Sequence, residues 1–193
     1  MNSFPSDVIE FEVDLVFHSM TDRHYFQSIN TLNKKFLTDS SLWKNYLHTW
    51  LRLLRLNESY FCPEIVTVAT SLSLGLQFTD DSTIRELNKT WLNKPEATDV
   101  LSFPLIDESY PLSITDSVEL GDIVVSIPTA QRQAQLHNHP LSVELQWLVS
   151  HGLLHLLGWD HQNSEALQDM LACQEHLMVI SGNVQSKQIK ANQ

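Results

Sequence analysis

Three histidines within residues 151–161, in the run HGLLHLLGWDH, constrain this chain more than any other feature of its sequence. His151 and His155 are four residues apart, so a helix would place both imidazoles on the same face, one above the other. Gly158 is expected to end that helix, because a glycine readily adopts the positive φ of a chain that turns back. His161 follows three residues later and can supply a third nitrogen. The run therefore predicts an apolar helix, a glycine turn and a cluster of imidazoles.

Three protein nitrogens with one coordination position left open are typical of catalytic zinc, whereas structural zinc usually takes a fourth ligand. The two cysteines, Cys62 and Cys173, both lie away from the histidine run in sequence. They have no CxxC partner, and we interpret them as reduced thiols. We therefore predict one Zn²⁺ per chain, bound by His151, His155 and His161. The residues identify no catalytic group beyond these ligands.

The same spacing occurs in metzincin zinc peptidases, with one difference. Those enzymes carry a glutamate directly after the first histidine, where it acts as the general base. Here that residue is Gly152, which can neither accept nor donate a proton. Peptide hydrolysis by that route is therefore disfavoured.

Several polar and aromatic residues have two interpretations each. Asp160 could orient a ligand imidazole or be a solvated turn residue, and Ser102 could bind substrate or be a buried strand residue. Trp159 is a candidate for the rim of the site. His137 and His139 show no ligand spacing and are interpreted as part of a solvated turn. The remaining tryptophans are interpreted as core residues: Trp43, Trp50, Trp91 and Trp147.

Hydrophobic patterns along the chain predict the order β-α-β-α-β-β-α-α-α. The predicted strands cover residues 8–17, 65–78, 100–105 and 122–127. The predicted helices cover residues 40–56, with Ser40 or Ser41 as N-cap, 82–91, 129–138, 141–157 and 164–180. We therefore expect an α/β (α+β) fold, in which a small mixed sheet packs against several helices in a single domain and the zinc site lies at a helix C-terminus.

Composition limits the classes of partner. The chain has 193 residues, of which 42% are hydrophobic, and a net charge of −11. It can bury a core, and its negative charge argues against a non-specific coat on DNA or on an anionic membrane. A local groove for nucleic acid stays compatible with it. Residues 1–17 carry four carboxylates and no Lys or Arg, which is unlike a secretory signal. We expect a soluble, cytoplasmic protein with neither a membrane nor DNA as partner.

Together with ELGDIVVS and ATDVLSFP upstream, the histidine run resembles the YbeY-type endoribonuclease, or rRNA maturation factor, family over residues 8–180. The resemblance implies a zinc-dependent, single-strand-specific endoribonuclease that matures the 3′ end of 16S rRNA and takes part in ribosome quality control. It implies ribosomal RNA as partner, with ribosomal proteins as further candidates, and it assigns the metal to the same three histidines. The corresponding domain is 1–180, in which 19–38 is interpreted as an insertion, and 181–193 is a polar, flexible tail.

Two positions depart from the family pattern. Leu92 stands where the family usually has an arginine that faces the substrate, and Ala97 stands where a proline usually precedes the strand. A guanidinium would bind a phosphate bidentately, which leucine cannot do. Either a nearby cation substitutes, with Lys94 favoured over Lys89 and Arg85, or the enzyme is slow.

Two alternatives to the endoribonuclease stay open. One is a ribosome-assembly or rRNA-binding factor whose zinc is mainly structural and whose nuclease activity is weak, which the negative charge and Leu92 favour. The other is a different zinc metallohydrolase, such as a peptidase, which Gly152 disfavours.

Overall fold

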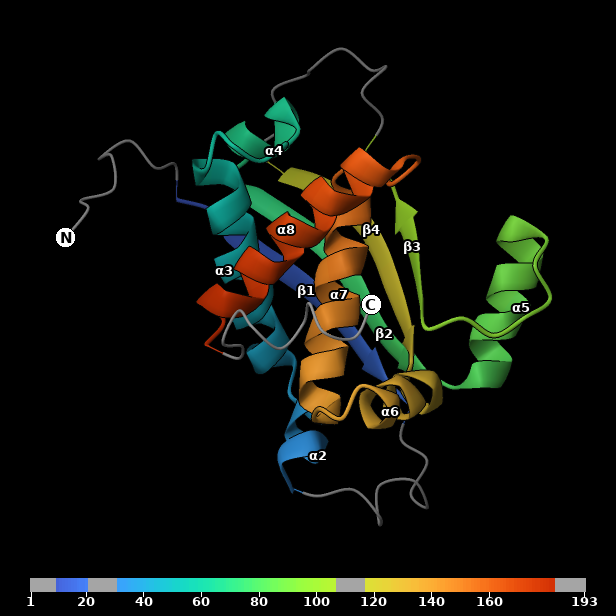
Figure 1. Ribbon diagram of the computed structural model, residues 1–193. Helices are drawn as coiled ribbons and strands as arrows, with labels where there is room; N and C mark the ends of the chain where they lie inside the picture. Colours follow the sequence, from blue (N-terminus) through green and yellow to red (C-terminus); the bar gives the residue numbers. More distant parts are fainter. Residues whose placement is uncertain (1–9, 21–30, 107–116, 183–193) are drawn as a thin grey trace.

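The computed structural model describes residues 10–20, 31–106 and 117–182, and Figure 1 shows a sheet of four strands with helices packed against it. The predicted tail therefore lies outside the described residues, except for its first two positions. The elements in chain order are β1 (Glu12–Ser19), α2 (Thr31–Thr38), α3 (Ser40–Leu56), α4 (Glu64–Val68), β2 (Ser71–Thr79), α5 (Asp81–Leu92), β3 (Val100–Pro104), β4 (Ser117–Ser126), α6 (Ile127–Leu136), α7 (Leu141–Leu156) and α8 (Ser164–Ile180).

The strands lie in the order β1-β2-β4-β3. β1, β2 and β4 are parallel neighbours, and β3 is antiparallel to β4 at the edge of the sheet. The parallel pairs are connected through helices, as the chain order requires. This mixed sheet with its helices confirms the predicted α/β class.

A bulge in β4 sets which of its side chains face the core. Ser73 of β2 pairs with Glu119, but Leu74 pairs with Gly121, so Leu120 is an extra residue. Gly121 has φ +121°, and a Cβ there would lie 2.0 Å from the carbonyl oxygen of Phe103. Only glycine fits this position. The bulge leaves Leu120 fully buried.

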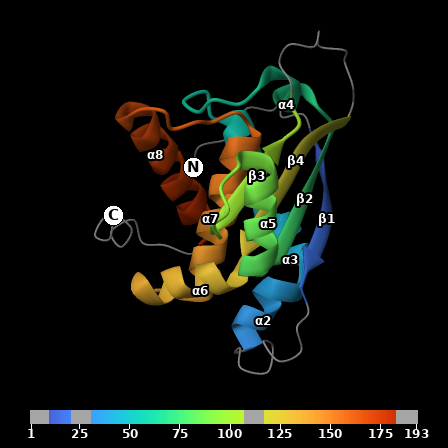
Figure 2. The same cartoon turned by 90° about the vertical axis from the view of Figure 1, so that its right-hand side faces the viewer.

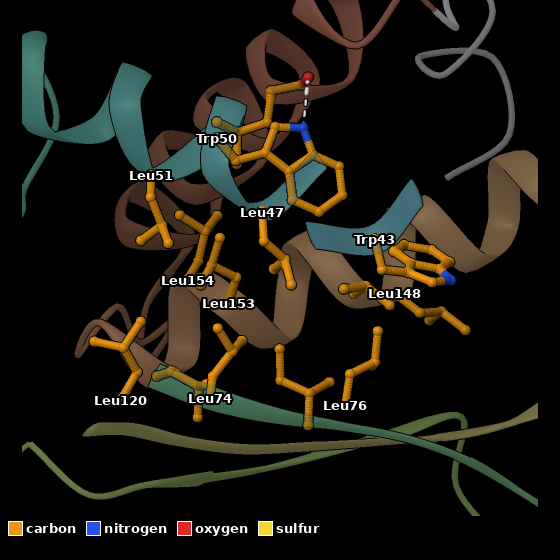
Figure 3. Packing of buried hydrophobic residues seen from close by; sticks show 14 of the residues in the cluster. Trp43, Leu47, Trp50, Leu51, Leu74, Leu76, Leu120, Leu148, Leu153 and Leu154 are labelled. Carbon is orange, nitrogen blue, oxygen red and sulfur yellow. Dashed lines mark hydrogen bonds between the residues drawn. The ribbon is translucent and has the colours of Figure 1, made fainter. Parts of the chain in front are cut away.

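The main core lies between the sheet and helices α3, α7 and α8 (Figures 1 and 3). Figure 3 shows Leu47 and Trp50 of α3 and Leu153 of α7 above Leu74 and Leu76 of β2. α7 is apolar on nearly all sides, which is typical of a helix buried in a core. The core therefore holds α7, the helix that carries His151 and His155, on several sides.

The opposite face of the sheet is partly covered by α5. Ile84 of α5 packs against Leu101 and Val124, which alternate with the residues that face α7. In Figure 2, α7 and α8 lie on one side of the strands. Trp91, predicted to be a core residue, is instead 65% exposed and contacts Phe103 edge to face. The prediction was wrong because α5 meets only the β3–β4 end of the sheet and leaves its own C-terminal turn uncovered.

Two local expectations differ from the structure. The first part of the predicted strand 65–78 is helix α4, which begins after Pro63, and only residues 71–79 form a strand. Asp39 caps α3 in place of Ser40 or Ser41, and its side chain accepts from the backbone N–H of Leu42. The insertion at 19–38 stays a prediction: its residues 31–38 form α2 and contribute Phe36 and Leu37 to the core, while 21–30 lie outside the described residues. None of the described helices is long and apolar enough to cross a membrane.

Candidate metal centre

α7 carries two of the three histidines of the sequence motif. It begins after Pro140, whose extended backbone precedes the first turn, and ends where Gly158 adopts φ +86°. Its burial fixes the side chains of His151 and His155 in place, and each ring is half-buried. His161, in the turn before α8, is exposed to solvent.

The structure brings all three imidazoles together. One nitrogen from each ring can be chosen so that the three lie within 4.8 Å of one another. The Nε2 atoms of His151 and His155 are 3.1 Å apart. Ligand atoms of a tetrahedral zinc site are roughly 3.3 Å apart, given metal–nitrogen distances of about 2.0–2.1 Å. In the described residues, the cluster includes no cysteine or carboxylate as a fourth ligand.

Hydrogen bonds on the far side of each ring decide which nitrogen faces the cluster. Nδ1–H of His155 donates to the backbone oxygen of Trp159 at 2.9 Å, and a carbonyl oxygen can only accept. The amide of Gln174 donates to the backbone oxygen of Trp147 at 2.7 Å, so its own oxygen faces Nδ1 of His151 at 3.4 Å. Both rings therefore carry the proton on Nδ1, and both Nε2 lone pairs face the centre of the cluster.

The charge state of the rings agrees with this assignment. Burial lowers the pKa of His151 to about 4, and burial also lowers the pKa of His155, so both rings are neutral at pH 7. Two neutral nitrogens that present lone pairs to each other at 3.1 Å repel unless an electrophile lies between them. A metal ion satisfies this arrangement, and the hydrogen bonds on Nδ1 are those of metal-bound histidines. The residues therefore fit a metal ion.

Gly152 lies where α7 crosses the sheet. A Cβ at this position would be 2.8 Å from Cγ2 of Ile123 and 3.1 Å from Oγ of Ser102. Ser102 donates its hydroxyl hydrogen to the carbonyl oxygen of Gly152 at 3.3 Å, which makes it a helix–strand contact. The space that a general-base side chain at residue 152 would need is therefore occupied by Ile123 and Ser102 of the sheet.

The turn between α7 and α8 is held by its own side chains. Asp160 accepts from the backbone N–H of His161 at 2.7 Å and from the amide of Gln162 at 2.8 Å. Of its two interpretations, the structure shows the turn residue. Trp159 contributes its carbonyl to His155 and donates its indole N–H to the backbone oxygen of Phe61 at 3.0 Å.

Leu92, which stands where the family usually has an arginine, and the residues around it are exposed. Leu92 is 54% exposed at the end of α5, and Lys94 is also exposed. Arg85 and Lys89 lie 3.9 Å and 4.0 Å from the carboxylate of Glu86. Arg85 and Lys89 therefore each lie beside a carboxylate, and the proposed role of Lys94 stays a prediction.

Sequence reasoning missed two features. Gln174 lies on α8, far from the motif in sequence, and helical periodicity alone does not show that it faces His151. His137 and His139 were interpreted as a solvated turn, but their side chains are 35% and 28% exposed and both lie beside the buried Glu144. A histidine pair followed five residues later by a carboxylate on an otherwise apolar helix face was the available signal.

Comparisons with known proteins agree on one family. The family model described as Endoribonuclease YbeY matches residues 26–181. A protein named Endoribonuclease YbeY from Prochlorococcus marinus (strain MIT 9313) is 49% identical over 95% of this chain and 98% of its own length. One of the same name from Synechococcus sp. (strain CC9902) is 52% identical over 75% of this chain and 81% of its own.

Among solved structures, the solution structure of a Thermotoga maritima protein matches with a TM-score of 0.48 and 19% identity, covering 86% of this chain and 89% of that one. The family-model match spans most of the chain, and both relatives are well above 30% identical. This confirms the resemblance inferred from the three sequence motifs. The chain belongs to the endoribonuclease YbeY family.

Proposed function

We propose that this protein is a zinc-dependent endoribonuclease that cleaves single-stranded ribosomal RNA. Within that activity, we propose the maturation of the 3′ end of 16S rRNA and a part in ribosome quality control. The observation that carries the proposal is the cluster of His151, His155 and His161, which is open to solvent on the His161 side. The relatives named as endoribonucleases support RNA as the substrate.

The chain's own residues would do two things at this centre. His151, His155 and His161 would hold the ion, and the oxygens of Gln174 and Trp159 would keep the two half-buried rings of His151 and His155 in the ligating tautomer. Zinc held there would act as a Lewis acid toward a phosphoryl oxygen and would lower the pKa of water to about 7.

Charge around the centre supports a role for the metal in RNA binding. Residues 133–186, which include α7, α8 and all three histidines, contain no Lys or Arg. In a protein of net charge −11, a divalent cation would be the main positive charge that these helices offer to a phosphate. Gly152 supports RNA over peptide as the substrate, since no base follows the first histidine.

The test is cleavage by highly purified protein of an RNA that spans the 3′ end of 16S rRNA, offered single-stranded and as a duplex. We expect zinc-dependent cleavage of the single strand that falls to background in His155→Ala. His18→Ala removes an exposed histidine outside the cluster and should keep full activity. Casein offered in parallel should stay intact.

Other outcomes would point elsewhere. RNA binding without zinc-dependent cleavage would favour the assembly factor, and zinc-dependent casein cleavage that is lost in His161→Ala would favour a peptidase. The same RNA assay on Leu92→Arg and Lys94→Ala, at matched zinc content, asks whether either position handles phosphate. We expect a slower reaction for Lys94→Ala, and equal rates for both variants and the wild type would contradict its proposed role.

A further inference from the structure

A second group of potential metal ligands lies at the joint between α6 and α7. His137 is the C-cap of α6, and its backbone N–H donates to the carbonyl of Gln133 at 2.8 Å. Asn138 then adopts φ +54°, and the N–H of His139 donates back to the carbonyl of Ala134 at 3.0 Å. This tight turn fixes the backbone on both sides of Asn138 and brings the two rings within 5.6 Å, centroid to centroid.

Glu144 completes the group from the first turn of α7. Its side chain is only 4% exposed, and its Oε2 lies 2.9 Å from Nε2 of His139 and 3.7 Å from Nδ1 of His137. All three ligand atoms fall within 4.8 Å of one another. These separations bracket the roughly 3.3 Å expected between the ligand atoms of a tetrahedral zinc site.

The local charges favour a positive charge at this point. A buried carboxylate is costly unless a positive charge accompanies it, and in the described part of the chain no Lys or Arg lies within ion-pair distance of Glu144. The C-terminal end of α6, which points at the same place, also favours positive charge. Nδ1 of His139 lies 3.3 Å from the carbonyl oxygen of Pro140, to which it can donate. Its hydrogen bond to Glu144 raises the pKa of His139, so in the metal-free protein a proton on Nε2 lies between the two atoms, and a bound metal ion would take the place of that proton.

We propose that Nδ1 of His137, Nε2 of His139 and Oε2 of Glu144 form a second binding site for a divalent transition metal of the zinc class. Two imidazoles and one carboxylate are a donor set that zinc accepts readily. The two imidazoles are partly exposed, which gives an ion a route in and leaves room for water as a further ligand.

An ion at this second site would have a structural role, not a catalytic one. Glu144 lies seven residues before His151 on α7, a rise of about 10 Å, which is too far for two ions to share a substrate at about 3.5–4 Å. An ion here would instead join the end of α6 to the start of α7, the helix that carries the other centre. Its occupancy therefore does not depend on the proposed ribonuclease activity.

The test counts ions. Metal-free wild-type protein, equilibrated with Zn²⁺ and desalted, should hold two zinc ions per chain by elemental analysis, and Glu144→Gln should hold one. Glu165→Gln is the matched control, because Glu165 also lies in the first turn of its helix but is exposed and outside the group. The double variant His151→Ala/His155→Ala should lose the zinc ion of the three-histidine centre and keep the one at His137, His139 and Glu144. Co²⁺ bound to this double variant should give a visible absorption spectrum. That spectrum should disappear when Glu144→Gln is combined with the double variant.

The outcomes separate the two sites. If the wild type holds one zinc ion per chain and His151→Ala/His155→Ala holds none, the second site is overturned and the ribonuclease proposal stays intact. Two zinc ions in Glu144→Gln also overturn it. Because Glu144→Gln could impair folding, His137→Gln, at the most exposed ligand, should weaken zinc binding at this site in a protein whose circular dichroism is unchanged.

Discussion

At the scale of single residues, the proposed metal centre depends on atoms that do not touch the metal. Gln174 is fully buried, and its amide can take only one orientation because its N–H group donates to the carbonyl of Trp147. Its oxygen therefore accepts from Nδ1 of His151. Gln174 is a positioning residue, and it acts through the tautomer of that ring.

We expect Gln174→Met to weaken zinc binding by roughly 10–100-fold, because methionine fills similar space but leaves Nδ1 of His151 without an acceptor. Competition with a chromophoric chelator measures the change. Gln168→Met, at an exposed position of the same helix, should bind as the wild type does. Equal affinities for the two variants would show that Gln174 has a packing role only.

The sequence predicted the histidine cluster because its members lie within one helical repeat and one turn of each other. It did not predict that Gln174 lies beside His151, or that Glu144 lies beside His137 and His139, since these contacts depend on how α8 packs on α7 and how α6 ends. Hydrophobic periodicity shows which face of a helix is buried but does not show which helix covers it.

At the scale of helices and strands, the sequence predicted the positions of most helices but not which elements cover them. α8 has the predicted bounds, residues 164–180, and begins after Asn163, whose side chain accepts from the backbone N–H groups of Glu165 and Ala166. α4 was predicted as a strand, since Ile65, Val66 and Val68 are β-branched, but Pro63 starts a short helix there and tertiary packing overrides the weak local preference. Trp91 fits the apolar stripe of α5 and is exposed because the sheet ends beneath it.

The contact between α7 and the sheet predicts the effect of Gly152→Ala. Alanine normally stabilises a helix by about 1 kcal/mol relative to glycine. Here its methyl group would lie 2.8 Å from the stiff, branched Ile123, and overpacking of this kind costs about 1–3 kcal/mol. We expect a net loss of stability in urea unfolding. The control is Ala172→Gly, at an exposed position of α8, which measures the helix preference of alanine over glycine alone. If Gly152→Ala instead stabilised the protein, the sheet would be able to move away from the added methyl group without a loss of stability.

The N-cap of α5 predicts a pH-dependent loss of stability. Asp80 accepts from the backbone N–H of Thr83, and this hydrogen bond is the main cause of its lowered pKa. A carboxylate whose pKa is lowered by folding stabilises the protein above its unfolded pKa of about 3.9, and this stabilisation is lost as the pH falls through the folded pKa. Asp80→Ala should therefore cost about 0.5–2 kcal/mol at neutral pH and less in acid.

Urea unfolding of the wild type and of Asp80→Ala at about pH 7 and about pH 3 checks this expectation. Asp80→Asn keeps an oxygen acceptor without the charge, so its difference from Asp80→Ala should not change with pH. A cost of Asp80→Ala that stays constant over this range would show that the charge contributes nothing.

At the scale of the whole molecule, the two proposed sites link metal binding to folding, because both join segments that are separate in an unfolded chain. A ligand at about 100 times its Kd stabilises the folded state by about 2.7 kcal/mol. For a chain of this size, that corresponds to a rise in Tm of roughly 5–10 °C per site. The family was predictable at this scale from three ordered motifs, whereas the negative charge of the chain suggested little about RNA.

We expect Zn²⁺ to raise the Tm of the metal-free wild type, to raise it less in His155→Ala, and to leave it unchanged in His155→Ala/Glu144→Gln. Differential scanning calorimetry at a fixed free-zinc concentration measures these shifts. His18→Ala, which alters neither group, should respond as the wild type does. A full shift in the double variant would place the stabilising ion elsewhere on the protein.

The close approach of α7 to β4 also bears on how this sequence could diverge. In the linear sequence, one substitution at residue 152 would complete the metal-and-base motif of a zinc peptidase. In three dimensions Ile123 occupies the volume that a glutamate side chain would need, and the sheet would have to move away from the helix to admit it. A new proteolytic activity is therefore not one mutation away, and a library that varies residue 152 alone should yield unstable proteins rather than peptidases.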